Sequence, residues 1–553
     1  MKSGFAFLFF IVTVCFQSRA QGIQPLWIPD TLSGPVINLS LAASQKQILP
    51  GAPTQTLAYN GLPMLGPTLM LRRGWQIETT VQNNLSDTST LHWHGLHVSA
   101  HTDGGPHSPI LPGQQWNPHF TCLDKASTYW YHPHFHKKTA RQTLSGAAGL
   151  IIVRDGEEAA LPLPRRYGIN DFPLIIQSLV MDAQNQIMPE GQQDSLVLVN
   201  GTFKPYLQIP AGWVRFRVLN ASNARNFYLG LQDTLPLFQI GSDGGLLGKP
   251  LKMNRVKISP GERAEIMVDF SGKQDSLFRI ISFGSEIPSG IQGGPTIPVP
   301  PGGPSMASPL NGKDFEILEL RVTAPLSSGS AFLPDSLAAQ TRIPESQAQR
   351  ERLIRFSSAV PGSTVGPFLV NDSLFNMNRI DFSVPVNSTE IWTLYNQTTV
   401  AHPFHLHGFQ FYILDRFGAP PPPEETGRKD MVLLTAQEQV RIIARFANFA
   451  DTTMPYMFHC HLLTHEDEGM MGQFVVAPLT SAMEKIKAGE PAVFPNPFSE
   501  RLYGLKKNQN IKVVNILGQP MPLIWLTPEI LDTSSWPAGL YGISGGKGRW
   551  VRK

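Results

Sequence analysis

Residues 456–471 of this chain read YMFHCHLLTHEDEGMM and place a cysteine between two histidines. If the first part of this stretch is a β-strand, successive side chains point to opposite faces. Cys460 then faces one site, while His459 and His461 face another. A thiolate, two imidazoles and a weakly bound thioether are the ligands of a blue-copper electron-transfer site. His465 and Met470 follow within ten residues, and His402, three residues before His405, would complete such a set.

Similar sequences recur elsewhere in the chain. Tyr129-Trp130-Tyr131-His132-Pro133-His134 resembles residues 456–461, and His92-Trp93-His94-Gly95 resembles His405-Leu406-His407-Gly408. The chain thus contains four His-x-His pairs, and in a strand both members of a pair point the same way, roughly 6.6 Å apart. Eight paired imidazoles exceed the three or four ligands of a single zinc ion. They can converge only if the two parts of the chain pack face to face.

The sequence around these motifs predicts β-structure. Residues 76–81 and 213–218 are rich in β-formers, and turn residues separate many such segments, since Gly and Pro number 48 each. A strand pattern with a tryptophan and a terminal asparagine occurs three times, at residues 74–84, 212–220 and 387–396. Three copies indicate three related domains. The middle one contains no histidine.

Together, these motifs resemble the multicopper oxidases of three cupredoxin domains, over residues from about 30 to 480. The resemblance implies an all-β fold of three cupredoxin-like Greek-key β-barrel domains plus a small C-terminal β-sandwich. The expected boundaries are a signal peptide at 1–20, cupredoxin domains at 21–160, 161–325 and 326–480, and a C-terminal secretion sorting domain at 491–553.

The same resemblance implies four copper ions: one type 1, one type 2 and a type 3 pair. The type 1 ligands would be His402, Cys460, His465 and Met470. The type 2 ligands would be His92 and His405. The type 3 ligands would be His94, His132, His134, His407, His459 and His461. Pro133 stands where Cys460 stands in the later copy, so the first domain offers no thiolate for a second blue-copper site.

The activity implied is one-electron oxidation of a small reducing substrate, coupled to four-electron reduction of dioxygen to water. Water formation needs protons in a buried site, so a carboxylate relay is expected. Asp103 and Glu466 stand where similar enzymes have acids near the trinuclear cluster, so the resemblance implies that they are the relay acids. We favour phenols or aromatic amines as donors, as in laccases. Several relatives that oxidise Cu(I) carry a Met- and His-rich insert, whereas residues 356–378 contain only Met377.

The sequence is also compatible with other functions. The second candidate is cuprous or metal-ion oxidation in copper tolerance. Four methionines could form a sparse thioether path for Cu(I), or they could be core residues: Met431, Met454, Met457 and Met471. A non-catalytic copper-binding surface protein is the third, although it would not need all twelve ligands. A two-domain copper nitrite reductase is disfavoured, because its chain would lack the repeated His pairs of both the first and the third domain. A copper store is disfavoured as well, because it would need many labile sites, whereas the ligand spacings here are fixed.

The ends of the chain predict export. Lys2, an apolar run over residues 5–16 and Ser18-Arg19-Ala20 are typical of a cleaved secretory signal. No later stretch is long and apolar enough to span a bilayer, so we expect no integral membrane segment in the mature chain. Removal of the signal leaves Cys122 and Cys460, hence at most one disulfide; Cys122 is interpreted as a buried thiol. The net charge of +3 gives no support to nucleic-acid binding.

The C-terminal tail has a resemblance of its own. It opens with Phe494-Pro495-Asn496-Pro497-Phe498, continues through residues 511–519 and ends in Arg552-Lys553. This pattern is similar to the C-terminal sorting domain of the type IX secretion system of Bacteroidetes. The resemblance implies that the type IX machinery is a partner, and that the protein passes through the periplasm to become secreted or attached to the cell surface.

Overall fold

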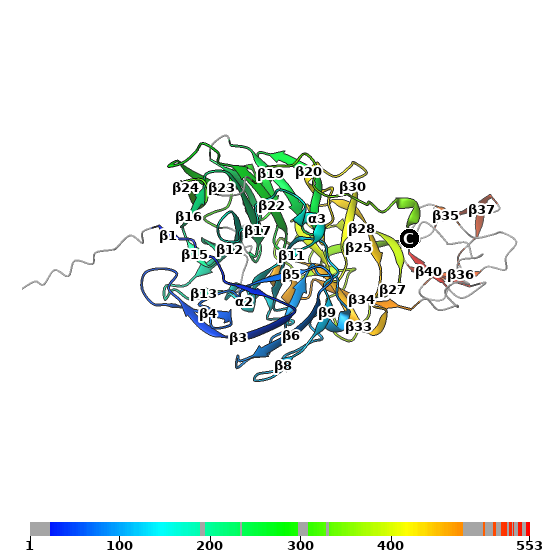
Figure 1. Ribbon diagram of the computed structural model, residues 1–553. Coiled ribbons are helices and arrows are strands. Elements are labelled where there is room, and N and C mark those ends of the chain that lie inside the picture. Colours follow the sequence, from blue (N-terminus) through cyan, green and yellow to red (C-terminus); the bar gives the residue numbers. More distant parts are fainter. Residues whose placement is uncertain are drawn as a thin grey trace, which may run out of the picture. The chain divides into compact units, whose positions relative to one another are not determined.

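The computed structural model describes residues 23–478, apart from 189–193, 233–234, 297–307 and 328–330, together with parts of residues 501–552. The chain divides into two compact units, Met1–Pro478 and Leu479–Lys553. Strands dominate both units (Figure 1), which confirms the predicted all-β class. The expected signal peptide, residues 1–20, lies outside the described residues.

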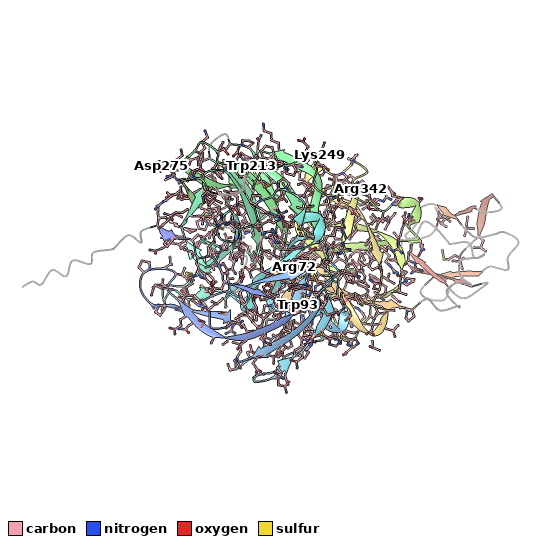
Figure 2. The ribbon with its side chains drawn as sticks, in the orientation of Figure 1. Arg72, Trp93, Trp213, Lys249, Asp275 and Arg342 are labelled. Atoms are coloured by element: carbon pink, nitrogen blue, oxygen red, sulfur yellow. The ribbon has the colours of Figure 1, made fainter. Side chains whose placement is uncertain are left out.

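The first barrel contains two sheets that enclose one apolar core. Their strand orders are β2-β5-β11-β10-β7 and β4-β3-β6-β8, with β9 paired to β6. The strands are β2 Thr31–Ser33, β3 Val36–Lys46, β4 Thr54–Tyr59, β5 Thr68–Arg72, β6 Gln76–Asn83, β7 His92–His94, β8 Gln115–Trp116, β9 His119–Thr121, β10 Ser127–His132 and β11 Gly149–Arg154. Alternate residues of β3, such as Ile37 and Leu39, pack with Trp93 in this core. Trp93 is labelled in Figure 2.

The second barrel is built from residues of the middle third and from the first described strand. Its sheets have the orders β1-β16-β24-β23-β18-β21 and β15-β14-β12-β17-β22-β19-β20, with β13 paired to β12. The strands are β1 Gln24–Pro25, β12 Asp171–Met181, β13 Ile187–Met188, β14 Leu196–Val199, β15 Thr202–Phe203, β16 Pro205–Pro210, β17 Trp213–Asn220, β18 Phe227–Leu231, β19 Leu237–Ser242, β20 Gly245–Met253, β21 Val256–Ile258, β22 Arg263–Asp269, β23 Leu277–Phe283 and β24 Asp314–Thr323. Because β1 pairs in parallel with β16, the chain enters this barrel before it forms the first one.

The third barrel repeats the plan of the first. Its sheets have the orders β26-β25-β28-β32-β30 and β27-β34-β33-β29-β31. The strands are β25 Arg350–Ser358, β26 Phe368–Val370, β27 Phe382–Pro385, β28 Ser388–Asn396, β29 His402–Leu406, β30 Phe411–Arg416, β31 Met431–Leu434, β32 Gln439–Phe446, β33 Asp451–Cys460 and β34 Met471–Ala477. Its core contains Cys460 and Met470 among aromatic residues.

Helices are few and short in the described residues. They are α1 Ala100–Asp103, α2 Thr139–Leu144, α3 Gly156–Ala159 and α4 Leu463–Asp467, with the 3₁₀ turns η1 Gly284–Glu286, η2 Glu345–Gln347 and η3 Pro423–Glu425. None of these is long and apolar enough to cross a bilayer. α4 touches α2 across the first and third barrels, where the Asp467 carboxylate accepts hydrogen bonds from the backbone N–H groups of Thr139 (3.0 Å) and Ala140 (2.9 Å).

The threefold strand pattern corresponds to the same structural device in each barrel. β6, β17 and β28 each pair in parallel with an earlier strand and end at a buried asparagine: Asn83, Asn220 or Asn396. Each asparagine side chain accepts a hydrogen bond from the backbone N–H two residues later and donates to carbonyls across the barrel. A short amide that bonds its own backbone is well suited to end a strand in a turn.

Buried charges join the second barrel to the first. Arg217 on β17 donates to Asp171 (2.7 Å) and to Glu265 (2.7 Å), while Arg215 donates to Glu158 of α3 (2.8 Å). Burial alone would raise the pKa of Asp171, but the combined attraction of Arg217, Arg215 and Arg154 outweighs burial and lowers that pKa to about 2. Such pairs withstand burial only because every charge has a partner.

The second unit contains two separate three-stranded sheets. Their orders are β35-β38-β37 and β36-β39-β40. The strands are β35 Arg501–Tyr503, β36 Lys512–Asn515, β37 Ile524–Thr527, β38 Ile530–Asp532, β39 Leu540–Ser544 and β40 Arg549–Arg552. These strands fall within residues 491–553, where the sequence predicts a small β-sandwich.

Candidate metal centre

The strand register places the histidine motifs beside one another within each barrel. In the first barrel His92 lies opposite His132, on the antiparallel strands β7 and β10. In the third, His405 lies opposite His459, on β29 and β33. Only the pair 92/94 lies wholly within a strand; the second members of the other pairs, His134, His407 and His461, follow the strand ends.

A group with one sulfur donor lies inside the third barrel. Cys460 Sγ lies 3.5 Å from His402 Nδ1 and 3.8 Å from His465 Nδ1, and these three residues form one potential metal site. All three are buried, and the ring of Phe368 packs on both imidazoles. Met470 is also fully buried, and its carbonyl accepts from the backbone N–H of Cys460 (3.1 Å). The four residues expected as type 1 ligands therefore come together in one apolar core.

Thr398 determines which nitrogen of His402 is available to a metal. Its hydroxyl oxygen lies 2.8 Å from the Asn396 side-chain oxygen and 2.9 Å from the Val400 carbonyl, and both of these atoms only accept. The single hydroxyl proton points there, so the oxygen accepts from His402 Nε2–H at 2.9 Å. His402 then presents the lone pair of Nδ1 to the side of Cys460. The asparagine turn of the threefold repeat thus orients a ligand in this barrel.

We predict that Thr398→Val changes the type 1 site without removing a ligand. The variant leaves the His402 N–H without an acceptor in a buried place, which costs about 1–3 kcal/mol of folding free energy. The visible absorption and the reduction potential of the type 1 copper should shift, and Thr398→Ser should restore both. Spectra and potentials identical in Thr398→Val and wild type would refute this role.

Two histidine trios lie between the first and third barrels. One is His94, His132 and His461, and the other is His134, His407 and His459. His94 Nδ1 and His132 Nε2 are 3.4 Å apart, and His459 Nε2 lies 3.0 Å from His407 Nε2. The two histidines of each His-x-His pair belong to different metal groups. Each pair therefore bridges two neighbouring metal positions. Each trio takes residues from both barrels, as the convergence of the motifs requires.

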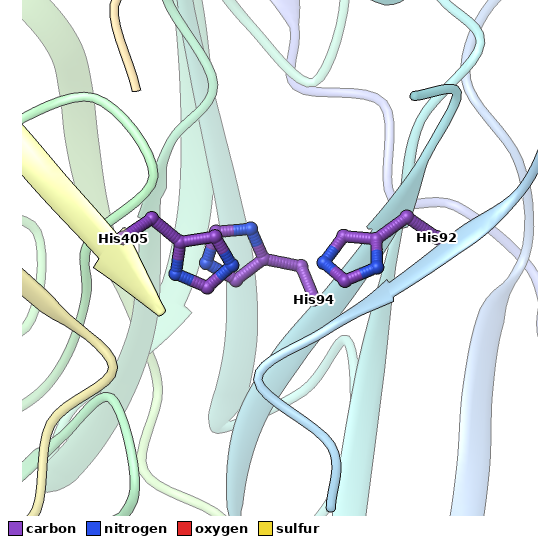
Figure 3. Close-up of side chains that lie close together, drawn as sticks. All are labelled: His92, His94 and His405. Atoms are coloured by element: carbon purple, nitrogen blue, oxygen red, sulfur yellow. The ribbon is translucent and has the colours of Figure 1, made fainter. Parts of the chain in front are cut away.

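His92 and His405 form a third position beside the trios. His405 stacks on His94, with ring centroids 3.8 Å apart, and His92 lies across from them (Figure 3). Backbone carbonyls hold their Nδ1–H groups: Asp103 O for His92 (2.9 Å) and Asp430 O for His405 (2.9 Å). Their Nε2 atoms are buried and have no hydrogen-bond partner among the described residues.

Burial keeps the imidazoles in the form that binds metals. It lowers the pKa of His459 and His465 to about 3. It also lowers the pKa well below the ordinary value for His94, His132, His134, His402, His405, His407 and His461. Neutral imidazole is the ligand form of histidine. Burial raises the pKa of the Cys460 thiol, and coordination is what deprotonates such a thiol.

Asp430, to which the sequence assigns no role, holds the ligands together. It accepts from His94 Nε2–H at 3.2 Å, and both of its carboxylate oxygens accept from the guanidinium of Arg263 on β22. Arg263 also donates to the carbonyl of Thr128 on β10 (3.1 Å), so one fully buried side chain contacts all three barrels. Gly95 must lack a side chain here, because a Cβ would lie 2.6 Å from both the Arg263 and the Asp430 side chains.

The two expected relay acids both lie at the second trio. Asp103 Oδ2 is 2.8 Å from His407 Nδ1. The two oxygens of Glu466 lie 3.4 Å from His134 Nδ1 and 3.4 Å from His459 Nδ1. Burial raises the pKa of Glu466 well above its ordinary value, and Asp467 adds to the shift. Burial therefore favours the neutral form of the Glu466 carboxyl, which places an ionisable proton beside the trio.

A reciprocal pair of hydrogen bonds joins the two His-x-His-Gly turns. His97 Nδ1–H donates to the Gly408 carbonyl at 2.6 Å, and Gln410 Nε2 donates to the Gly95 carbonyl at 3.1 Å. His97 and Gln410 occupy equivalent positions of the duplicated motif, three residues after the second histidine. We call these two side chains the interdomain clamp, because each barrel holds the turn of the other.

The remaining histidines and the free cysteine lie outside the metal groups. His107 bonds Gln473 (2.8 Å), the largely exposed His101 pairs with Asp451 (2.7 Å), and His136 packs on Phe375. His119 is exposed. Cys122 is a buried free thiol, as the sequence predicts.

Comparison with known proteins places these groups in a family. Residues 41–158 and 343–480 each match a profile described as multicopper oxidase. The multicopper oxidase mco of Staphylococcus haemolyticus is 33% identical over 432 residues, which cover 76% of this chain and 84% of that protein. The chain belongs to the multicopper oxidase family.

Other proteins resemble the chain to a similar degree. The structure of a laccase-like multi-copper oxidase, CueO, from Ochrobactrum sp. is 32% identical, with a TM-score of 0.72, over 82% of this chain and 100% of that chain. This similarity confirms the cupredoxin-like architecture. The cell division protein FtsP of Edwardsiella tarda is 33% identical over 84% of this chain and 95% of that protein. Family membership therefore does not by itself assign an oxidase activity.

The residues of this multicopper oxidase fit copper. His407 and His459 both use Nδ1–H to donate, to Asp103 and to the Cys460 carbonyl, so their Nε2 lone pairs face each other at 3.0 Å. Two lone pairs at that distance repel unless a cation lies between them. The sulfur and imidazole donors of the Cys460 group suit copper in both oxidation states. The type 1 set would hold one ion, the two trios the type 3 pair, and His92 with His405 the type 2 ion.

Proposed function

We propose that this multicopper oxidase is laccase-like: it couples one-electron oxidation of phenolic or aromatic amine donors to reduction of dioxygen to water. The observation that carries the proposal is the complete set of ten histidines, Cys460 and Met470, gathered in buried groups. Four donor molecules give four electrons, and four protons accompany them when one dioxygen becomes two waters. Copper, four ions when all sites are filled, supplies the one-electron couples and the affinity for oxygen that side chains lack.

The chain's own residues would connect and supply these sites. Cys460 lies between His459 and His461, which belong to different trios, so consecutive residues link the mononuclear group to both. Asp103 and Glu466 contact the outward nitrogens of the second trio. Glu466, whose neutral form is favoured by burial, is the residue best suited to deliver a proton there. Asp467, the last residue of α4, accepts hydrogen bonds from backbone N–H groups of α2 and so holds this end of α4 in place.

The donor side favours organic substrates. Met431, Met457 and Met471 are at most 1% exposed, and Met454 is half-buried against the third core, so these methionines serve packing and offer no exposed thioether path. The Ochrobactrum enzyme is described as acting on lignin model compounds. Next to the type 1 group, the Ala401 N–H donates to the Gly290 carbonyl (2.8 Å), so the second barrel covers the chain just before His402.

Oxygen uptake by the copper-loaded protein, run in parallel with a phenol and with Cu(I), tests this function. We expect fast uptake with the phenol and slow uptake with Cu(I), after correction for spontaneous Cu(I) oxidation. The reverse result would favour cuprous oxidation in copper tolerance. Blue protein with no uptake from either donor would favour a non-catalytic copper-binding role, and the FtsP relatives would then be the better guide.

We further propose that residues 491–553 form a sorting domain for the type IX secretion machinery. The motif at residues 494–498 and the strands β35–β40 support this proposal. The protein would then pass through the periplasm and become secreted or attached to the cell surface.

Deletion of residues 491–553 should trap the protein in the periplasm of its host. Met1–Pro478 is a compact unit by itself, so the truncated protein should still fold and bind copper. Fractionation of cells that express both forms measures the effect, and the blue colour of the retained protein verifies folding. Export of the truncated form at the full-length level would exclude the sorting role.

A further inference from the structure

A cavity of about 320 Å³ lies where the three barrels meet, and none of the twelve predicted copper ligands lines it. Lys125 comes from the first barrel, Leu246 from the second and Arg428 from the third. Ligand sites in proteins commonly have volumes of about 300–1,000 Å³ and lie at domain interfaces. The position and size of this cavity are therefore those of a binding site.

The interdomain clamp forms part of the lining of this cavity. Both His97 and Gln410 line it, and so does the buried Asp124. The Asp124 carboxylate accepts from the backbone N–H of His97 (3.2 and 3.0 Å) and from Gln410 Nε2 (3.4 Å). Its oxygens are thus used to hold the clamp. A ligand in the cavity would rest directly on the contacts between the first and third barrels.

Two arginines bring positive charge to the cavity, and one of them, Arg428, also attracts the buried Asp124 carboxylate. Lys125 is paired with Glu157 (3.1 Å), but neither Arg428 nor Arg445 forms an ion pair with any residue that the structure describes. Arg428 is half-buried, and its carbonyl is fixed by the Gly244 N–H (2.9 Å). Guanidinium groups only donate hydrogen bonds, and carboxylates match their planar fork. Arg428 and Arg445 exceed the single negative charge of Asp124, so the cavity favours an anion.

One side of the cavity is apolar, although Gln340 and Thr341 also line it. Tyr412 and Phe409 are almost fully buried, and Ile343 and Leu246 complete this side. A hydrated inorganic anion would leave these walls in contact with water, whereas a flat apolar group would cover them. We propose that the cavity binds a small aromatic carboxylate, with its carboxylate on Arg428 and Arg445 and its ring against Tyr412 and Ile343.

Titration calorimetry of the copper-loaded full chain with benzoate tests this proposal. Benzoate lacks a phenolic group, so binding is measured without turnover. We expect one benzoate per chain, and at least tenfold weaker binding in Arg428→Gln and in Arg445→Gln, as for loss of a charged hydrogen bond. Arg350→Gln, at an exposed arginine on β25 outside the cavity, should bind like wild type. Benzyl alcohol and inorganic phosphate should each bind at least tenfold more weakly than benzoate.

Several results would overturn the proposal. Absence of benzoate binding to wild type would exclude the site. Binding by both cavity variants as tight as by wild type would place benzoate outside the cavity, and a changed copper spectrum on binding would place it at the copper ions. Phosphate as tight as benzoate would overturn the aromatic class. Copper content and melting temperature verify that the variants fold; if Arg428→Gln does not, the more exposed Arg445→Gln decides alone.

Discussion

Glu466→Gln is expected to slow steady-state oxygen uptake by about 100- to 10,000-fold, the range that a positioned acid contributes. The amide has nearly the same shape as the carboxyl but cannot release a proton at neutral pH. Because Glu466 contacts the second trio and not the Cys460 group, the blue colour should stay at the wild-type level. Oxygen uptake, visible absorption and copper content of the same preparation measure the three quantities.

Glu468→Gln is the matched control for this prediction. Glu468 follows two residues later and is exposed, so its amide variant should turn over like wild type. Wild-type turnover in Glu466→Gln would remove Glu466 from the proton supply. Loss of copper from Glu466→Gln would show instead that the carboxyl positions His134 and His459.

Arg263→Leu is expected to lower the free energy of unfolding by about 3–5 kcal/mol, because it leaves a buried carboxylate without its partner. The carboxylate concerned is that of Asp430, which is 0% exposed and also holds His94. The variant should therefore bind less copper in the trios as well. Chemical denaturation and copper analysis measure the two effects.

Arg279→Leu provides the comparison on the same barrel. Arg279 pairs with Glu316 at 3.0 Å, but both side chains are more than a third exposed, and such pairs contribute about 0–1 kcal/mol. Equal stability of Arg263→Leu and Arg279→Leu would mean that the barrels do not depend on the buried pair. Arg263→Lys, which keeps a charge but loses the fork, should lie between wild type and Arg263→Leu.

The metal groups were predictable because the information is local and duplicated. His92-Trp93-His94-Gly95 and its later copy predict adjacent strands, and the register of β29 against β33 places His405 opposite His459. The threefold asparagine pattern likewise predicted three related barrels. A dipeptide strand such as β1 carries no such pattern, so its pairing with the second barrel could not be foreseen.

The residues that hold the ligands were not predictable in the same way. Thr398, Asp430 and the clamp residue His97 contact their partners only after two barrels have packed together. Arg263 contacts three barrels, and nothing in its own neighbourhood along the chain distinguishes it from a surface arginine. One feature of the sequence could have indicated the clamp: His97 and Gln410 stand at the same place in the duplicated motif.

Because each trio draws ligands from both the first and the third barrel, metal affinity and docking of the two barrels are one thermodynamic quantity. Any change that lowers the fraction of docked protein raises the apparent copper dissociation constant in inverse proportion to that fraction. Conversely, the supply of copper determines what fraction of newly made chains keep their barrels docked. A cell short of copper would therefore hold less stable protein, and not only less active protein.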